Sequence, residues 1–130
     1  MLLVEFGMQS IQHNIFVYGS LKRGFTNHSL LAGQRFIATS RTESRYKLYD
    51  LGDFPGMVEA ATGGGSIEGE IWSVDPECLA RLEILEDTAH GMYARVPIPL
   101  LPPDEKLSVE GYLYRLSVTG RRDCGDVWTE

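Results

Sequence analysis

Two short strand-like segments, each with a glycine at its centre, constrain the fold of this chain more than any other feature. They are residues 67–72 (IEGEIW) and 109–114 (VEGYLY), with Gly69 and Gly111 in the middle. A glycine weakens the interior of a strand unless a bulge or the close approach of another backbone requires it. Two such strands therefore predict a small, strongly curved sheet or barrel.

Further strand patterns surround these two segments. Apolar and β-branched residues predict strands at residues 15–18, 35–51, 57–60 and 95–101. The longest of these is expected to be a hairpin that bends near residues 41–45, and residues 53–56 (DFPG) are expected to form a turn. Pro97 and Pro99 confine the last strand to an edge, because proline cannot donate to a ladder. Strands dominate and do not alternate with helices, so the predicted class is α+β with a curved mixed sheet.

One segment has clear helical periodicity. Asp75 is a suitable N-cap and Pro76 suits the first helical position, so a helix is predicted from there to about residue 86 or 87. At roughly 100° per residue, Glu86 falls within the apolar stripe of this helix and Asp87 is rotated away from it. The stripe itself is formed by Cys78, Leu79, Leu82 and Leu85.

The first strand ends abruptly in a glycine turn. Residues 15–17 are apolar and favour a strand, and Gly19 lets the backbone turn where a side chain would clash. The main-chain N–H groups of the loop are then left without strand partners, and such groups commonly hold an anion, a carboxylate or a carbonyl oxygen. An ordinary strand-exit turn is the alternative. The candidate binding residues of this loop are Tyr18, Gly19, Ser20 and Leu21.

Glu86 is the candidate catalytic residue. A carboxylate on a buried stripe is costly unless it is paired or protonated, so its pKa is expected to rise into the range useful to a general base. The alternative is a helix-terminal glutamate that reaches solvent or pairs with Arg95. Tyr93 and Arg95 lie on one face of the next strand, where Arg95 could anchor a substrate carboxylate or be a surface charge.

Polar residues that follow the loop are interpreted as structural. Asn27 is expected to cap a short helical turn at residues 28–32. Pairing of Ser20 with His28 or His90 would make a nucleophile, but Ser20 has no nucleophile-elbow context.

Composition narrows the class of protein. The 130 residues fit a single domain, with a core at about 14–118, a lead-in at 1–13 and a polar tail at 119–130. The net charge of -6 argues against a nucleic-acid partner. Two cysteines and three scattered histidines offer no metal-ligand spacing, and no segment is long enough to span a membrane. Residues 1–7 lack the basic region of a signal peptide and two cysteines are too few for a disulfide framework, so free thiols in a reducing cytoplasm are expected. A monomer is expected from the size of the chain and the absence of an obvious exposed apolar helix.

Five segments in register resemble the gamma-glutamylcyclotransferase-like proteins, and most closely the gamma-glutamylamine cyclotransferase branch with its bacterial and plant relatives. The resemblance covers about residues 14–116. Its segments are residues 16–24 (FVYGSLKRG) with Asn27 and His28, 46–57 (YKLYDLGDFPGM), 67–72, 82–95 and 109–114. Glu83 stands where the family pattern usually has aspartate, and the segment between Glu86 and Tyr93 differs from some members.

The resemblance implies a fold and a reaction. The implied fold is a roughly six-stranded barrel with flanking helices. The implied reaction is attack of the α-amine of a small γ-glutamyl substrate on its own γ-carbonyl, which releases 5-oxoproline and a free amine or amino acid without metal or cofactor. Glu86 would move the proton and the loop at Tyr18–Leu21 would hold the glutamyl end.

Three alternatives stay open at this point. Asp87 could align as the catalytic carboxylate in place of Glu86, although the helix-face argument favours Glu86. The chain could be a non-enzymatic member of the fold that binds a small metabolite or a protein. It could also use the same chemistry to remove a γ-glutamyl protecting group in a biosynthetic pathway.

Overall fold

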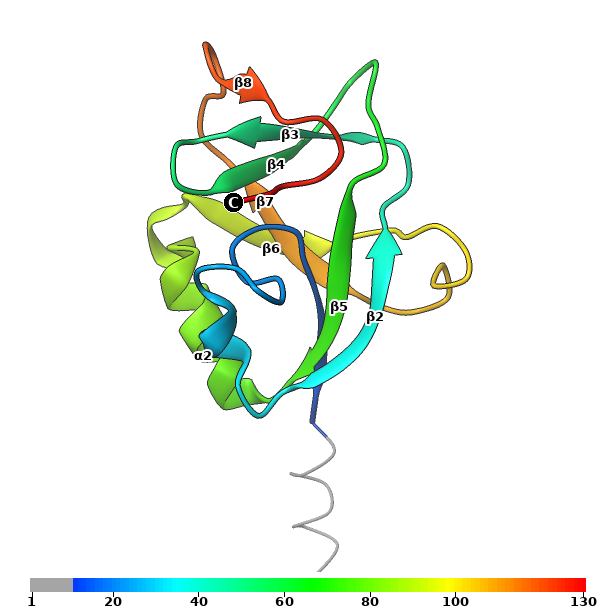
Figure 1. Cartoon of the computed structure of the whole chain (residues 1–130), viewed down its shortest axis with the longest axis vertical. Helices are drawn as coiled ribbons and strands as arrows, with labels where there is room; N and C mark the ends of the chain where they lie inside the picture. The colour runs from blue at the N-terminus through cyan, green and yellow to red at the C-terminus, as the bar shows by residue number, and fades with distance from the viewer. Residues whose placement is uncertain (1–10) are drawn as a thin grey trace, which may run out of the picture.

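The computed structural model describes residues 11–130, and the larger of its two sheets has five strands. The sheet runs in the order β2-β5-β1-β7-β6, with β1 at its centre (Figure 1). Strand β1 is antiparallel to β5 and parallel to β7, so the sheet is mixed. The strands are β1 (His13–Val17), β2 (Arg35–Arg41), β5 (Glu68–Val74), β6 (Tyr93–Pro97) and β7 (Glu110–Tyr114).

A smaller sheet lies across one end of the larger one, at the top of Figure 1. It has the order β4-β3-β8 and consists of β3 (Tyr46–Asp50), β4 (Pro55–Glu59) and β8 (Arg122–Asp123). Strands β3 and β4 form an antiparallel hairpin in which Leu51 N donates to the carbonyl of Phe54 at 3.0 Å. The observed turn therefore comes slightly earlier in the chain than the predicted one, and Pro55 already belongs to β4.

The predicted barrel is wrong, although the α+β class and the mixed sheet are confirmed. Among residues 11–130 neither sheet closes on itself, and β2 and β6 are the two edges of the larger sheet. The segments that follow β2 and β6 in the chain meet at a single bridge between Thr42 and Leu100. At this bridge Glu43 N donates to Pro99 O at 3.0 Å, and Leu101 N donates to Arg41 O at 2.9 Å. Pro97 and Pro99 have no N–H to donate, so a continuous ladder cannot form between these edges.

The two central glycines of the sequence lie on either side of β1. A Cβ atom at Gly69 would lie 2.5 Å from the carbonyl oxygen of Val17, and one at Gly111 would lie 3.2 Å from that of Phe16. The side chains of Phe16 at Gly69 and of Ile98 at Gly111 come equally close or closer, at 2.5 Å and 2.9 Å. The predicted close approach of another backbone is thus confirmed, together with tight side-chain packing.

The hairpin predicted for residues 35–51 is wrong. Strand β2 pairs with β5 in the larger sheet, whereas β3 pairs with β4 and β8 in the smaller one. The chain passes from one sheet to the other at Thr42, which is fully buried and whose Oγ1 accepts a hydrogen bond from Ile67 N at 2.9 Å. This buried polar contact fixes the crossing point, because leaving the Ile67 amide unpaired would be unfavourable.

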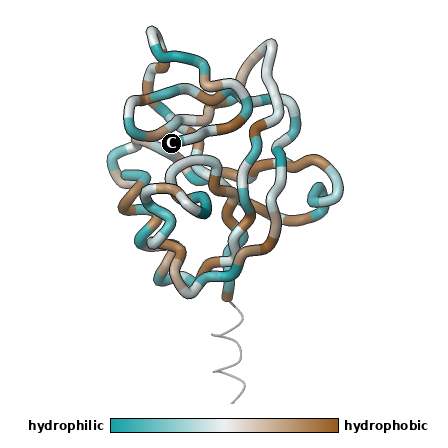
Figure 2. Tube along the Cα trace, in the orientation of Figure 1, coloured by the Kyte–Doolittle hydropathy of each residue, from teal (hydrophilic) through white to brown (hydrophobic). Residues whose placement is uncertain are grey.

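The predicted helix is confirmed as α2 (Pro76–Leu85), whose N-cap Asp75 accepts a hydrogen bond from Cys78 N at 2.7 Å. Hydrophobic and hydrophilic residues alternate along it, as expected of a helix at the surface (Figure 2). Leu85 departs from the predicted stripe, since it is 38% exposed. The buried residues of the helix are Cys78, Leu79 and Leu82.

Two 3-10 turns accompany this helix, η1 (His28–Leu31) and η2 (Thr88–His90). The predicted cap of the first is wrong, because the side chain of Asn27 makes no capping hydrogen bond and binds Ser20 instead.

The core has two layers, one on each face of the larger sheet. Alternate residues of β1 point to opposite faces: Phe16 belongs to the layer between the two sheets, and Ile15 and Val17 belong to the layer under α2. Leu48 and Met57 of the smaller sheet complete the first layer, and residues of α2 and η1 complete the second. The end of β1, where the smaller sheet and the end of α2 both come near it, is where the candidate site lies.

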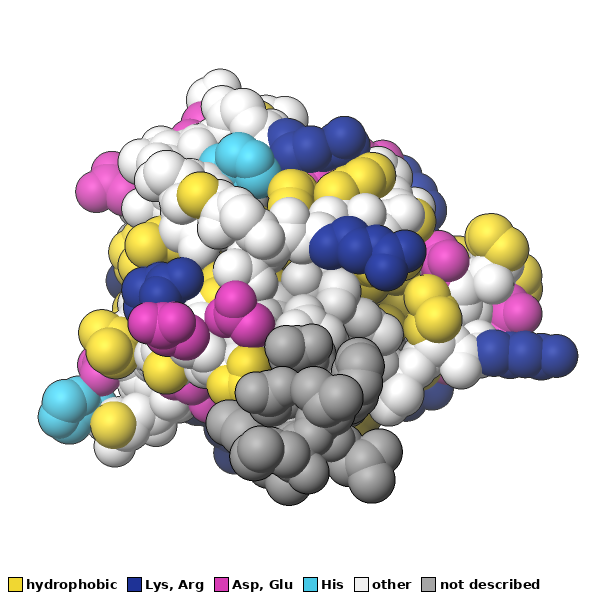
Figure 3. Space-filling view, turned by 90° about the horizontal axis from the view of Figure 1, so that it is seen from below, with side chains coloured by type: hydrophobic (Ala, Val, Ile, Leu, Met, Phe, Trp, Pro, Cys, Tyr) yellow, Lys and Arg dark blue, Asp and Glu magenta, His cyan; other side chains and the backbone are white. Residues whose placement is uncertain are grey.

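Charges are mixed on the face seen in Figure 3, where basic and acidic side chains are interspersed among apolar ones. Within residues 11–130, no helix combines the length and the apolar composition needed to cross a membrane. Cys78 and Cys124 are both free thiols.

Candidate active site

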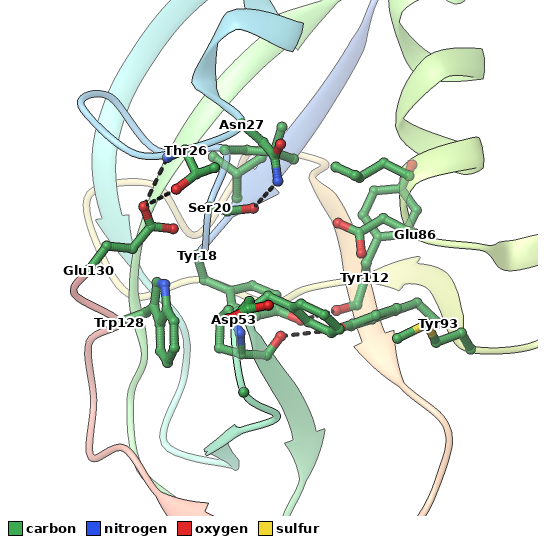
Figure 4. Close-up of a pocket in the computed structure, with 18 of the residues that line it drawn as sticks. Tyr18, Ser20, Thr26, Asn27, Asp53, Glu86, Tyr93, Tyr112, Trp128 and Glu130 are labelled. Atoms are coloured by element: carbon green, nitrogen blue, oxygen red, sulfur yellow. Dashed lines mark hydrogen bonds between the residues drawn. The ribbon is translucent and has the colours of Figure 1, made fainter.

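A cavity of about 690 Å³ opens at the end of β1. Its walls come from the loop after β1, the turn before β4, the end of α2 and the last residues of the chain (Figure 4). The predicted site residues that line it are Tyr18, Gly19, Ser20, Leu21, Glu86 and Tyr93. Segments far apart in the sequence are thus brought together, and the predicted donor loop and the predicted carboxylate line the same cavity.

The loop after β1 presents free main-chain donors. Lys22 N donates to the carbonyl of Gly19 at 3.1 Å and closes the turn. In the described chain, the N–H groups of Gly19, Ser20 and Leu21 donate to no other backbone group. Successive N–H groups without backbone partners at the wall of a cavity are candidate donors to an anion or a carbonyl oxygen.

Gly19 is required by packing against the neighbouring turn. A Cβ atom at this position would lie 2.8 Å from Cγ and 2.9 Å from Cδ of Pro55, and the φ angle of Gly19 is not in the left-handed region. The sequence predicted a glycine that avoids a clash, and the structure identifies the clashing group as the proline ring.

Two tyrosine hydroxyls are occupied by backbone contacts. The Tyr18 hydroxyl donates to the carbonyl of Tyr112 at 2.6 Å and accepts from Met57 N at 3.1 Å, which joins the loop to β7 and β4. The Tyr93 hydroxyl donates to the carbonyl of Pro55 at 2.8 Å. Burial is the main reason why the pKa of each phenol is raised, so both stay neutral. Their rings shape the cavity while their hydroxyls hold its walls together.

Glu86 projects from the end of α2 into the cavity (Figure 4). Its carboxylate makes no hydrogen bond within 3.5 Å and no ion pair within 4.0 Å to any other described residue. Desolvation by burial, followed by the nearby Glu83 carboxylate, raises the pKa of Glu86 from 4.5 to about 7. A carboxyl group with a pKa near neutrality can both accept and donate a proton.

Asp87 lies outside the cavity lining. It has a left-handed backbone, with φ of 53°, and therefore ends the helix directly after Glu86. Its carboxylate bonds to His90 Nδ1 at the surface. The geometry thus favours Glu86 over Asp87 as the carboxylate that faces a ligand.

Arg95 also lies outside the cavity lining, so its predicted contact with a substrate carboxylate is not supported by its position. Its Nε lies 3.6 Å from Oε1 of Glu83, and its Nη1 lies 3.6 Å from Oε1 of Glu110. The predicted partner was Glu86. The observed partner on the helix is Glu83, which is one turn earlier.

No serine–histidine pair is present among these residues. Ser20 Oγ accepts a hydrogen bond from Asn27 Nδ2 at 2.8 Å, and His28 Nδ1 contacts the carbonyl of Leu21 at 3.0 Å. His90 is exposed and bonds to Asp87. These contacts hold the loop in shape and offer no activated nucleophile.

The wall formed by the last residues of the chain was missed by the sequence analysis. Trp128 is 6% exposed and lines the cavity, although it lies in a segment that looked like a polar tail. Lys22 Nζ donates to the carbonyl of Trp128 at 2.8 Å, and the Glu130 carboxylate accepts from Thr26 N at 2.9 Å. A lone tryptophan in a polar stretch was the available signal, because so large an apolar surface is rarely left in water.

The charged side chains of the lining are all acidic. Asp53, Glu86 and Glu130 line the cavity, and its described lining contains no lysine, arginine or histidine. A negative group on a ligand would therefore be bound by main-chain N–H groups, and a positive group by a carboxylate. In residues 11–130 no group of three or more His, Cys, Asp or Glu side chains is arranged to hold a metal ion.

The fold and the cavity define a small α+β protein in which main-chain donors and a carboxylate line the same cavity. The family described as "Gamma-glutamyl cyclotransferase, AIG2-like" matches residues 15–130, and the chain belongs to this family. A protein of Vibrio cholerae named "Putative gamma-glutamylcyclotransferase" is 46% identical over 77 residues, which are 59% of this chain and 64% of the relative. This match therefore spans less than two thirds of the relative's length.

Solved structures of similar proteins have the same fold. The crystal structure of c4763, a uropathogenic E. coli-specific protein, superposes with a TM-score of 0.77 at 27% identity and covers 91% of this chain and 93% of that one. The structure of an AIG2-like protein from Mus musculus superposes with a TM-score of 0.71 at 25% identity over 91% of this chain and 88% of that one. The family resemblance drawn from the sequence motifs is confirmed.

Proposed function

We propose that this protein is a γ-glutamyl cyclotransferase. Its substrate carries a γ-glutamyl group on an amine, and the α-nitrogen of that group attacks the γ-carbonyl carbon. A carbon–nitrogen bond forms and closes a five-membered ring, while the bond from the same carbon to the leaving nitrogen breaks. The products are 5-oxoproline and a free amine or amino acid.

One observation carries this proposal: the unpaired carboxylate of Glu86 and the free N–H groups of residues 19–21 line the same cavity. Because its pKa is raised to about 7 by burial and by Glu83, Glu86 has both protonation states available near neutral pH. Glu86 accepts the proton that the attacking nitrogen loses and delivers it to the leaving nitrogen. Both proton transfers are assigned to one side chain, so the proposed reaction requires no metal or cofactor.

The main-chain donors hold the other end of the glutamyl group. The N–H groups of Gly19, Ser20 and Leu21 bind the substrate's α-carboxylate or stabilise the oxyanion that develops on the γ-carbonyl. A basic side chain is not needed for this role, which agrees with the acidic lining. Ring closure is intramolecular, so the cavity acts mainly by holding the substrate in its folded, reactive conformation.

The same geometry serves different leaving amines. Removal of a γ-glutamyl protecting group in a biosynthetic pathway would use the same residues. A protein that only binds a small metabolite is the competing function, since fold alone does not establish activity. That the protein works as a cytoplasmic monomer on a small molecule is part of the proposal and rests on composition.

A substrate panel tests the proposed reaction. Release of 5-oxoproline is measured for γ-glutamyl-ε-lysine, γ-glutamyl-alanine, glutathione and a γ-glutamyl alkylamine, and binding of 5-oxoproline is measured by calorimetry. Turnover of at least one substrate is expected, together with product binding. Binding of 5-oxoproline without turnover of any substrate would favour the metabolite-binding function, and absence of both would contradict the proposal.

A further inference from the structure

A half-buried charged cluster lies beside the candidate active site and has no part in the proposed reaction. The side chains of Arg95 and Glu83 in this cluster are 27% and 30% exposed. The cluster joins residues from three elements: Glu83 from α2, Arg95 from β6, and Glu110 and Tyr112 from β7. Arg95 lies 3.6 Å from Glu83 and 3.6 Å from Glu110, so one guanidinium faces two carboxylates. The cluster therefore keeps a net negative charge.

Three atoms of this cluster are buried without a hydrogen-bond partner. They are Oε2 of Glu83, Nη1 of Arg95 and the hydroxyl of Tyr112. Burial raises the pKa of Tyr112, and a hydrogen-bonding interaction with the Glu83 carboxylate raises it further. The phenol and this carboxylate therefore lie close together, although their geometry falls short of a regular hydrogen bond. Buried polar atoms left this way are uncommon in folded proteins, and a charged cluster is not an efficient means of stabilising a fold.

The position of Glu83 links the cluster to the candidate active site. Glu83 and Glu86 are three residues apart at the end of α2, so their side chains are neighbours on one face. Tyr112 lines the cavity together with Glu86 (Figure 4). A charge on Glu83 thus acts on Glu86 across a short distance and through a partly desolvated region.

We propose that Glu83 is a positioning residue for Glu86. As a charged carboxylate paired with Arg95 one helical turn before Glu86, it favours the protonated form of Glu86 in the free protein. When the substrate's ammonium group binds, its positive charge has the opposite effect to the negative charge of Glu83 and favours the ionised form of Glu86. Glu86 then releases its proton to solvent and is ready to accept the one from the attacking nitrogen. This inference rests on the proposed role of Glu86 in the reaction.

Other titratable groups also face Glu86 and contribute to the electrostatic environment of its carboxylate. Tyr18 follows β1, Tyr93 lies on β6 and Tyr112 lies on β7, and all three are neutral phenols with a raised pKa. Asp53 and Glu130 line the same cavity from the turn before β4 and from the chain end. Glu83 is the carboxylate that shares the helix face of Glu86.

The test is a titration of Glu86 by carbon-13 NMR, with its signal assigned by its loss in Glu86→Gln. Glu83→Gln is expected to move the titration midpoint down by about one pH unit. Arg95→Met removes the balancing positive charge and is expected to move it up. Glu83→Asp keeps the charge and is expected to leave the midpoint near that of the wild type.

Glu77→Gln is the matched control, because Glu77 is an exposed glutamate in the first turn of the same helix. Nine residues separate it from Glu86, which is about 13 Å along the axis, and its charge is largely screened at that distance. Its removal is expected to leave the midpoint unchanged. An unchanged midpoint in both Glu83→Gln and Arg95→Met, or a shift in the same direction in both, would overturn the proposal.

The titration separates this inference from the proposed reaction, since it needs no substrate. If the wild type releases 5-oxoproline, the acidic limb of its pH–rate profile is expected to move with the NMR midpoint in Glu83→Gln. If the wild type has no turnover, the proposed function fails, and the NMR shift still decides whether Glu83 controls the proton on Glu86.

Discussion

A Cβ atom at Gly19 would lie 2.8 Å from Cγ of Pro55, so the donor loop packs directly against the turn before β4. The carbonyl of the same proline accepts the hydroxyl of Tyr93 at 2.8 Å. A change at Gly19 therefore affects the loop, the turn before β4 and the tyrosine on β6 together.

Replacing Gly19 with alanine or valine is expected to weaken ligand binding. The added carbon atoms collide with Pro55, so the loop must shift and its N–H groups lose their alignment. The affinity for 5-oxoproline, measured by calorimetry, is expected to fall, and more for valine than for alanine. Gly65→Ala is the control, because its Cβ would lie 3.9 Å from the nearest atom. Unchanged affinity in both Gly19 variants would remove the loop from the site.

Tyr18→Phe is expected to destabilise the fold. The substitution leaves the buried Met57 N–H and the Tyr112 carbonyl without their partner, which lowers the free energy of unfolding by about 1–3 kcal/mol. Urea unfolding measures this loss. Tyr49→Phe is the control, since the described structure shows no hydrogen bond from the Tyr49 hydroxyl to another residue. Equal stability of the two variants would show that the Tyr18 hydroxyl does not hold the two sheets together.

Lys22→Met is expected to loosen the wall that contains Trp128. Methionine keeps the length of the side chain but cannot donate to the Trp128 carbonyl, so the last residues of the chain detach more easily. KM for the best substrate is expected to rise about tenfold with a smaller change in kcat, since a hydrogen bond from a charged group contributes about 1.5–3 kcal/mol and about 1.4 kcal/mol is a factor of ten. Lys106→Met, in an exposed loop, is the control. A fall in kcat with unchanged KM would contradict this role.

Burial of Glu86 makes the stability of the fold depend on pH. Its pKa is about 7 in the folded protein and 4.5 without the fold, so the folded state binds the extra proton between these values. The free energy of unfolding is therefore expected to fall as the pH rises through this range, by up to about 3 kcal/mol from this group. Glu86→Gln removes the effect and is expected to be more stable than the wild type at pH 8, as judged by urea unfolding. A Glu86→Gln variant that is less stable than the wild type at pH 8 would contradict the raised pKa.

Local signals in the sequence predicted the parts of the structure that depend on neighbouring residues. Asp75 and Pro76 fix the start of α2, and the inward position of Glu86 follows from its place on the apolar stripe. The strand that ends near Gly19 was also visible, because its apolar run and its glycine are adjacent in the sequence. The close packing at Gly69 and Gly111 was also predictable, because a glycine inside a strand-like segment is itself a local signal.

Pairings between distant segments could not be predicted in this way. Strands β2 and β3 are adjacent in the sequence but pair in different sheets. The buried Thr42 between them accepts a hydrogen bond from Ile67 N, so the chain crosses to the smaller sheet there and forms no hairpin. Closure into a barrel requires the edge strands β2 and β6 to pair with each other. Pro97 and Pro99 limit this pairing because they have no N–H to donate. The pairing of Arg95 with Glu83 rather than Glu86 depends on the register between a helix and a strand, and the position of Trp128 depends on a contact with Lys22, 106 residues away.

The most direct test of the central claim is the turnover number of Glu86→Gln with the best substrate of the panel, measured beside the wild type, Glu77→Gln and Asp87→Asn. Glu86→Gln is expected to lose about 10²–10⁴-fold in kcat while it still binds 5-oxoproline. Glu77→Gln and Asp87→Asn are expected to keep most of the activity, because neither residue lines the cavity and asparagine tolerates the left-handed backbone at position 87. Substantial turnover by Glu86→Gln, or its loss in Asp87→Asn with Glu86 intact, would contradict the assignment of Glu86 as the acid and base.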